Sequence, residues 1–236
     1  MYNFTSRIRY SEVNSEGALT LQALMDYLQD CCSFQSEDLG VGVEYLKRIN
    51  HAWVLSSWEI VITQMPQMGD NIRVNTWPYN FKGFYGCRNF TIEDESGRVL
   101  VAANSLWVFM DLERMRPARI SAELLQAYQD GFGAELEGAW GDRKIEVPAG
   151  GEHREPVPVA KFFIDTNHHM NNSKYVTVAQ EFLPEDFVVG RIRVEYKKAA
   201  MLGDVLYPVL TTEQGKVTVV LADETEAPYA VMEFIA

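Results

Sequence analysis

The chain follows one plan twice, and this repetition constrains its fold more than any other feature. In each half a polar loop precedes an amphipathic helix, and strand-like segments follow the helix. In the first half, apolar residues from 21 to 32 keep helical spacing after Thr20, a residue type that caps helices. In both halves a Gly-Asp pair comes after the first strand, at Gly69-Asp70 and at Gly203-Asp204. The sequence therefore predicts an α+β chain built from two copies of one unit, each a sheet wrapped around a helix.

The expected strands pair in antiparallel fashion, because consecutive strands are joined by short turns without helices between them. Pro66, Pro78 and Ser96-Gly97 are read as turn residues. The expected strands are 4–10, 53–64, 71–77, 86–94 and 98–110 in the first half, and 188–198, 204–212, 216–222 and 229–235 in the second.

The segment 131–158 is rich in Gly, Pro, Glu and Asp and shows little periodicity. We interpret it as a linker. The predicted organisation is therefore an N-terminal unit at 1–130, the linker, and a C-terminal unit at 159–236.

The composition excludes several classes of function. A formal net charge of −12 argues against general binding to nucleic acid or to anionic membranes. No apolar run approaches the roughly 18 residues that a membrane span needs, and the first residues have no hydrophobic leader, so we expect a cytoplasmic protein. Cys31, Cys32 and Cys87 form neither a disulfide framework nor metal-ligand spacing, and no nucleotide fingerprint occurs. We therefore expect no metal and no other cofactor.

The polar stretch before the second helix concentrates the residue types that suit catalysis. Asp165, Asn167 and His169 lie just ahead of a run with helical spacing, so a helix is expected to begin near Asn171 or Asn172. The amide N–H groups and dipole of a helix N-terminus can stabilise the negative charge on a carbonyl oxygen under attack. We interpret this stretch as the active site, although Asp and Asn before a helix also serve as turn and cap residues.

Several stretches of the chain resemble the acyl-acyl-carrier-protein (acyl-ACP) thioesterases of plant plastids and bacteria. The pattern Asp165-x-Asn167-x-His169-x-Asn171-Asn172-x-Lys174-Tyr175 resembles the central signature of that family. Further matches along the first half are Leu39-Gly40, Trp53-Val54-Leu55, Gly69-Asp70, Thr76-Trp77 and Arg114-x-Arg116-Pro117-x-Arg119-Ile120. The resemblance implies a double hotdog fold, with two tandem units of antiparallel sheet wrapped around a long helix.

The resemblance also implies hydrolysis of fatty acyl-ACP to a free fatty acid. Asp165 would be the general base or the nucleophile, Asn167 would position the water or the carbonyl, and His169 would carry or orient a proton. The C-terminal unit would then be catalytic, and the N-terminal unit would bind the acyl chain. Supporting roles would fall to Asn171, Asn172 and Glu181.

The substrate requires two further sites. An acyl chain needs an apolar tunnel, and residues that could line it, or could equally be core, are Met25, Leu28, Trp53 and Trp58. The acyl carrier protein is acidic, so docking on this acidic chain needs a local basic patch. The candidates, which could also form a solvated face, are Arg114, Arg116, Arg119, Lys197 and Lys198.

The sequence departs from the plant pattern at Ala199-Ala200, where plant members carry Glu-Cys and the glutamate is thought to join the catalytic network. An alanine side chain can neither accept a hydrogen bond nor transfer a proton. Either Asp165, Asn167 and His169 suffice, or another acid substitutes, or the enzyme is slow. The alternatives are an acyl-CoA thioesterase of the same fold and a non-enzymatic acyl-binding hotdog protein. Under any of these readings the chain could be a monomer or a homodimer.

Overall fold

The computed structural model describes residues 1–138 and 140–236. Two compact units divide the chain: unit 1 is formed by residues 1–56 and 62–140, and unit 2 by residues 57–61 and 141–236. No helix in the described part of the chain combines the length and the apolar character that crossing a bilayer requires. The domain boundaries expected from the sequence stay a prediction.

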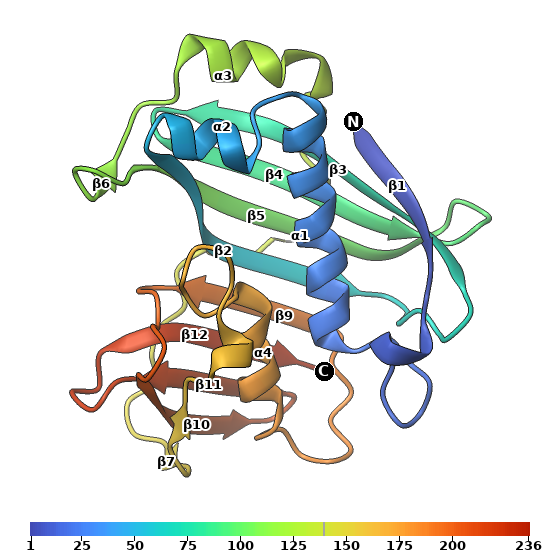
Figure 1. The fold of residues 1–236 in the computed structure, drawn as a ribbon. Helices are drawn as coiled ribbons and strands as arrows, with labels where there is room; N and C mark the ends of the chain where they lie inside the picture. Colours follow the sequence, from blue (N-terminus) through green and yellow to red (C-terminus); the bar gives the residue numbers. More distant parts are fainter. Residues whose placement is uncertain (139) are drawn as a thin grey trace. The chain divides into compact units, whose positions relative to one another are not determined.

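Unit 1 is an antiparallel sheet with one long helix, α1 (Leu21–Asp38), against it (Figure 1). The strands follow the order β1-β3-β4-β5, and the part of β2 up to Ser56 lies beside β5. The strands are β1 (Tyr2–Arg7), β2 (His51–Ile62), β3 (Asn71–Lys82), β4 (Tyr85–Glu93), β5 (Val99–Asp111) and the short β6 (Arg116–Pro117). The shorter helices are α2 (Val43–Arg48), α3 (Ala122–Ala127) and the 3₁₀ turns η1 (Tyr10–Glu12) and η2 (Gln129–Gly131).

The start and the buried face of α1 follow from its sequence. The Thr20 hydroxyl accepts a hydrogen bond from the Ala23 amide at 3.2 Å, which confirms the predicted N-cap. Leu24 and Leu28 are fully buried on the face toward the sheet, as their helical spacing requires. The Cys31 thiol donates to the Val74 carbonyl of β3 at 3.4 Å, so the cysteine is a buried core group.

Two expectations for the first half are wrong. Pro78 was expected in a turn, but it lies inside β3, where the pairing with β4 shifts between Pro78 and Asn80. A bulge accommodates proline because the ladder hydrogen bond that proline cannot donate is already interrupted there. The first strand ends at Arg7 and not at Tyr10, because the Glu12 carboxylate accepts from the Arg9 amide at 2.8 Å and closes η1.

Unit 2 has a similar plan with a shorter helix, α4 (Asn172–Gln180), which packs against β11 and β12 (Figure 1). The strands follow the order β9-β12-β11-β10-β7, and residues 57–61 of β2 pair with β9 in antiparallel fashion. The elements are β7 (Glu152–His153), β8 (Val157–Pro158), η3 (Lys161–Phe163), β9 (Arg191–Tyr196), β10 (Val205–Glu213), β11 (Lys216–Ala222) and β12 (Pro228–Ile235).

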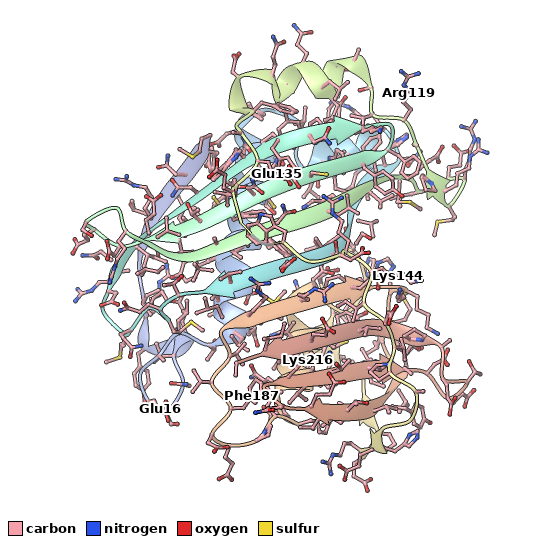
Figure 2. All side chains as sticks on the ribbon, turned by 180° about the vertical axis from the view of Figure 1, so that it is seen from behind. Glu16, Arg119, Glu135, Lys144, Phe187 and Lys216 are labelled. Atoms are coloured by element: carbon pink, nitrogen blue, oxygen red, sulfur yellow. The ribbon has the colours of Figure 1, made fainter. Side chains whose placement is uncertain are left out.

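The segment 131–158, which the sequence predicts as a linker, makes hydrogen bonds to strands of each unit. In unit 1 the Trp77 indole donates to the Ala134 carbonyl at 2.7 Å, and Figure 2 shows the part that carries Glu135 running over this sheet. In unit 2 the Gly141 amide donates to Glu59 at 2.7 Å, and β7 and β8 pair with β10. These partners are distant in sequence, so local periodicity did not reveal them.

Candidate active site

The candidate catalytic side chains lie on a tight loop between η3 and α4 in unit 2. The Asp165 amide donates to the His169 carbonyl at 2.9 Å, and Oδ1 of Asp165 accepts from the Asn167 amide at 2.8 Å. His168 has a φ of 63°, in the left-handed region that a tight reversal of the chain needs. Asp165 is half-buried, and Asn167 and His169 are exposed. The loop therefore presents a carboxylate, an amide and an imidazole within five residues.

The helix behind this loop begins where the sequence predicted. Asn171 is the N-cap of α4, and its Oδ1 accepts from the Ser173 amide and the Ser173 hydroxyl, both at 2.9 Å. Asn172 is the first helical residue, and its carbonyl accepts from the Tyr196 hydroxyl at 2.9 Å. Asn171 thus has a structural partner. Glu181 follows the last helical residue and is exposed.

A turn between β9 and β10 holds the other side of the loop. The Met170 amide donates to the Ala200 carbonyl at 2.8 Å, and His169 forms an isolated β-bridge with Met201. Oδ2 of Asp204 accepts from the Met201 amide at 2.8 Å, which closes the turn. The backbone of His169 is therefore tied to a hydrogen-bonded turn. Ala199, at the position of the plant glutamate, is exposed.

One buried phenol, Tyr175, and one half-buried phenol, Tyr196, lie next to this arrangement. The Ala200 amide donates to the Tyr175 hydroxyl at 2.8 Å, and the ring of Tyr175 packs edge-on against Tyr196 with 5.6 Å between centroids. Burial raises the pKa of Tyr175 to about 12, and the nearby Asp204 and Asp165 charges act in the same direction. Burial also raises the pKa of Tyr196 well above its ordinary value. Both hydroxyls therefore remain neutral at physiological pH. The sequence had shown Tyr175 only as the last residue of the stretch that resembles the family signature.

The residues expected to line an acyl tunnel are divided between the units. In unit 1, Met25 and Leu28 are buried on α1, and Trp53 stacks on Phe81 with 5.7 Å between centroids. Trp58 is buried in unit 2. Their role as a tunnel stays a prediction.

The five expected carrier-docking cations differ in how freely their charge is presented. Three have carboxylate partners: Arg114 pairs with Asp111 at 3.3 Å, Lys197 with Glu195, and Lys198 with Asp223. Among the described residues, no ion pair involves Arg116 or Arg119 of unit 1, and both are exposed (Figure 2 labels Arg119).

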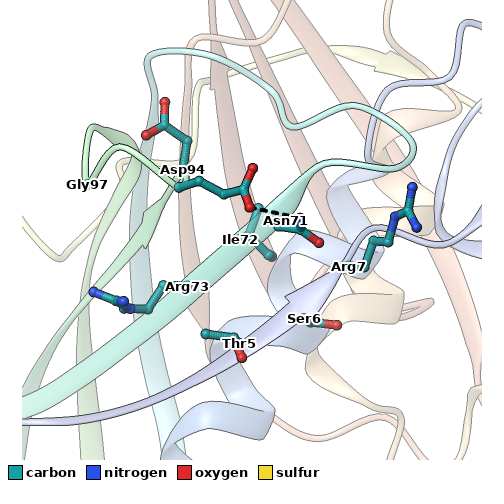
Figure 3. Close-up of a pocket in the computed structure, with 9 residues that line it drawn as sticks. Thr5, Ser6, Arg7, Asn71, Ile72, Arg73, Asp94 and Gly97 are labelled. Carbon is teal, nitrogen blue, oxygen red and sulfur yellow. Dashed lines mark hydrogen bonds between the residues drawn. The ribbon is translucent and has the colours of Figure 1, made fainter.

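A separate polar groove of about 570 Å³ lies in unit 1, where β1 ends and β3 begins (Figure 3). Its walls carry both signs of charge, and the Asn71 side chain donates to Glu95 at 2.9 Å. Figure 3 shows the guanidinium groups of Arg7 and Arg73 pointing away from one another. The groove contains none of the expected catalytic residues, and its cations do not converge on one ligand. The lining residues are Thr5, Ser6, Arg7, Asn71, Ile72, Arg73, Asp94, Glu95 and Gly97.

No cluster of three or more His, Cys, Asp or Glu side chains within the described ranges is arranged to hold a metal ion.

Solved structures with the same fold define the class to which this architecture belongs. The chain is similar over 99% of its length to an acyl-ACP thioesterase from Bacteroides thetaiotaomicron, with a TM-score of 0.89, 22% identity and 96% of that chain covered. It is also similar over 99% of its length to the 12:0-ACP thioesterase from Umbellularia californica, with a TM-score of 0.85, 20% identity and 96% of that chain covered. The fold is thus the double hotdog, as the sequence predicted.

Family models account for both halves of the chain. The acyl-ACP thioesterase N-terminal domain matches residues 1–128, and the acyl-ACP thioesterase C-terminal domain matches residues 149–229. The chain belongs to the acyl-ACP thioesterase family.

Two plant relatives give the scale of the similarity. The acyl-[acyl-carrier-protein] hydrolase FATB1 of Cuphea viscosissima is 24% identical over 225 residues, which are 89% of this chain and 54% of that protein. The dodecanoyl-[acyl-carrier-protein] hydrolase of Cinnamomum camphora is 23% identical over 91% of this chain and 60% of its own length. The chain therefore spans little more than half the length of these curated relatives.

Proposed function

We propose that the protein hydrolyses the thioester of fatty acyl-ACP and releases a free fatty acid. The observation that carries this proposal is the loop of unit 2, which presents Asp165, Asn167 and His169 ahead of a helix N-terminus in a chain whose two halves both match the family. Hydrolysis of a thioester needs an activated nucleophile and a polarised carbonyl. A thiolate leaves readily, so a strong general acid is dispensable.

Each loop residue has a role in this proposal that its position allows. Asp165 activates the attacking water or attacks the carbonyl carbon itself, since its carboxylate is held by the Asn167 amide. The exposed side chain of Asn167 positions the water or the carbonyl, and His169 carries or orients the proton. The positive end of the α4 dipole favours the negative charge of the oxyanion, while the Ser173 amide itself donates to the Asn171 cap.

The carrier is proposed to dock on exposed cations. Arg116 and Arg119 are the strongest candidates, because the described residues give neither of them an ion-pair partner that neutralises its charge. Fixed positive charge steers an acidic partner even when the whole chain is acidic. Lys197 and Lys198 are weaker candidates because each is already paired. The oligomeric state and the cytoplasmic location stay predictions.

The test compares one acyl chain on two carriers, acyl carrier protein and coenzyme A, with Asp165→Asn and His169→Ala as variants. Asp165→Asn changes little besides the charge, because the asparagine side chain keeps an oxygen that can accept from the Asn167 amide. We expect kcat to fall by about 10²- to 10⁴-fold, with the melting temperature unchanged. The matched control is Asn14→Asp in unit 1, which should leave kcat unchanged.

The outcomes separate the alternatives. Faster turnover on coenzyme A than on acyl carrier protein would favour the acyl-CoA thioesterase. Binding of acyl chains without turnover on either carrier would favour the non-enzymatic protein, for which the exposed Ala199 is the structural argument. Full activity in both loop variants would contradict the site assignment.

A further inference from the structure

Most of the exposed large apolar side chains of unit 2 lie on the two elements that flank the candidate catalytic loop. Phe162 of η3 is 73% exposed, and Met201 and Leu202 of the turn after β9 are 44% and 54% exposed. The other large apolar side chains exposed among the described residues of unit 2 are Val147 and Val188. Single apolar side chains on a surface are ordinary, whereas a group of them indicates a contact surface. We call Phe162, Met201 and Leu202 the apolar patch.

Backbone contacts tie both elements of the apolar patch to the loop. The Val159 amide, which precedes η3, donates to the Asp204 carbonyl at 2.8 Å, and the Gly203 amide donates back to the Val159 carbonyl at 3.1 Å. The same turn holds the loop through the isolated bridge between His169 and Met201. The segment that leads into η3 and the loop are therefore fixed to one turn, and the apolar patch flanks the loop.

Unit 1 contains a counterpart of η3. An isolated bridge begins directly after each 3₁₀ turn, at Val13 after η1 and at Ile164 after η3. The middle residue of η1, Ser11, therefore corresponds to Phe162. Ser11 is exposed. The fold thus accepts a polar residue at the position of Phe162.

The turn after β9 has a counterpart in unit 1 as well. Gln67 forms an isolated bridge with Ala18, as Met201 does with His169. Gln67 is exposed, so the fold also accepts a polar residue at the position of Met201. Two of the three members of the apolar patch are therefore peculiar to unit 2, which is the unit that carries the candidate catalytic side chains.

The third member and the two lysine positions complete the comparison. Leu202 has an apolar counterpart in Met68, which is 53% exposed, so this residue does not distinguish the units. The first residue of η1 is Tyr10 and the third residue of α1 is Ala23, whereas η3 and α4 carry lysines at these positions. Unit 2 thus differs from unit 1 by gaining both apolar and cationic groups around its loop.

The two lysines present charge that no ion pair neutralises. Lys161 is exposed and directly precedes Phe162, and Lys174 is half-buried in the first turn of α4. The ion pairs of lysines among the described residues of unit 2 involve neither of them. The acids of the same elements, Asp165 and Asp204, are half-buried and each accepts from a backbone amide. The lysine charges are therefore available to an acidic partner.

We propose that the apolar patch, with Lys161 and Lys174 beside it, is a docking surface for the acyl carrier protein on unit 2. This inference rests on the proposed hydrolysis and adds an apolar contact to the cations proposed on unit 1. The carrier is an acidic protein whose thioester must reach the loop, and the apolar patch flanks that loop. Protein interfaces combine an apolar centre with a polar rim, and coenzyme A has no protein surface that could cover the apolar patch.

The decisive variant gives the apolar patch the residues that unit 1 carries. Phe162→Ser combined with Met201→Gln removes the two apolar groups and introduces side chains that the fold already accommodates at the corresponding positions. We expect the KM for acyl-ACP to rise by about 10- to 100-fold, because buried aromatic anchors carry much of the affinity of an interface. The kcat, the KM for the same acyl chain on coenzyme A and the melting temperature should stay unchanged. An unchanged KM for acyl-ACP, or an equal rise on both carriers, would overturn the proposal.

The matched control is Val188→Ser. It removes an apolar side chain of unit 2 that is 79% exposed and precedes β9, whereas the turn of the apolar patch follows this strand. We expect this control to keep the KM for both carriers. A second variant, Lys161→Glu, should raise the KM for acyl-ACP at low salt, and the rise should shrink as salt screens the charge. Equal effects of Val188→Ser and of the double variant would contradict the proposal.

A binding measurement distinguishes this inference from the proposed function. Acyl carrier protein that bears its phosphopantetheine arm without an acyl chain is titrated onto the wild type and onto the double variant. If the wild type hydrolyses acyl-ACP and both proteins bind this carrier equally, only the docking surface is wrong. If the wild type hydrolyses neither thioester, the proposed hydrolysis fails, and weaker carrier binding by the double variant still supports the docking surface. Binding of anionic phospholipid vesicles that the double variant loses, with equal carrier binding, would assign the apolar patch to a membrane and overturn the proposal.

Discussion

The loop before α1 and the loop before α4 have the same backbone and carry different side chains. In both, the first residue accepts from amides further along the loop: Asn14 from Glu16 and Ala18 at 3.0 Å each, and Asp165 from Asn167 at 2.8 Å. The fourth residue is left-handed in both, with φ of 81° at Gly17 and 63° at His168. The paired positions are Asn14 and Asp165, Ser15 and Thr166, Glu16 and Asn167, Gly17 and His168, and Ala18 and His169.

This comparison distinguishes the backbone shape of the loop from the side chains that the loop carries. The unit 1 loop folds with an amide, a carboxylate and a methyl group where unit 2 has a carboxylate, an amide and an imidazole. The shape of the loop therefore does not depend on the candidate catalytic side chains. Those side chains can be exchanged with little effect on folding, which makes the comparison experimentally accessible.

The largest effect is expected from exchanging the whole loop. Replacing residues 165–169 by the five residues of the unit 1 loop should preserve the fold and lower kcat by at least about 10²- to 10⁴-fold, because the carboxylate and the imidazole are both lost. Thermal unfolding and acyl-ACP hydrolysis are the measurements. The reverse exchange in residues 14–18 is the control and should leave kcat unchanged. Normal turnover in the variant that carries the unit 1 loop at residues 165–169 would show that the side chains of the unit 2 loop are not needed for hydrolysis.

The next largest effect concerns the hydrogen-bonded pair of Tyr175 and Ala200 next to the unit 2 loop. Tyr175→Phe leaves the buried Ala200 amide without an acceptor, so the free energy of unfolding should fall by about 1–3 kcal/mol. Adding Ala200→Pro removes that amide hydrogen and should restore most of the loss. Chemical denaturation of the single and double variants measures both steps. If the double variant is less stable than Tyr175→Phe alone, the backbone of the turn at Ala200 does not accommodate proline.

A smaller effect is expected at the left-handed residue. Gly17→Ala places a Cβ at φ 81° in open space, so only backbone strain acts, and the free energy of unfolding should fall by about 1–2 kcal/mol. The matching change, His168→Gly, should not lower stability and should leave kcat intact. Chemical denaturation and the hydrolysis assay measure the two changes. A large loss of kcat in His168→Gly would assign the His168 imidazole a direct role.

The smallest effect is expected at the helix caps. Thr20→Ala removes the acceptor for the Ala23 amide and should lower the free energy of unfolding by about 1 kcal/mol, with kcat unchanged. Asn171→Ala should cost a similar amount and should also lower kcat, because Asn171 lies two residues after His169 of the candidate catalytic loop. Denaturation curves and initial rates give the two readouts. Equal kcat in both variants would show that the cap of α4 has no influence on the loop.

Much of this arrangement could be predicted from the sequence because it rests on local signals. Thr20 was recognised as a cap, and its hydroxyl accepts from the Ala23 amide. The Gly-Asp turns were recognised as a repeat, and both glycines have a φ of 91°. Residue type and spacing also located the loop between η3 and α4.

What could not be predicted depends on partners that are distant in sequence. Proline usually ends a strand, so the bulge that admits Pro78 into β3 was not visible. Gly141 is anchored by Glu59, 82 positions earlier. Leu24 and Tyr175 are both the fourth residue after a helix cap, Thr20 in α1 and Asn171 in α4. This correspondence appears only when the caps are matched in the structure, because α1 has 18 residues and α4 has 9.

The division of β2 has a consequence for folding. Residues 57–61 belong to unit 2 and pair with β9, so Ser57 lies opposite Glu195, 138 positions later in the chain. Contacts of such long range form slowly, because a large loop must close before they are made. A fragment made of residues 141–236 alone would also leave the β9 edge unpaired, and exposed edges favour aggregation. The pairing of β2 with β9 is therefore expected to form late, and cutting the chain between its two family domains would separate residues 57–61 from the rest of unit 2.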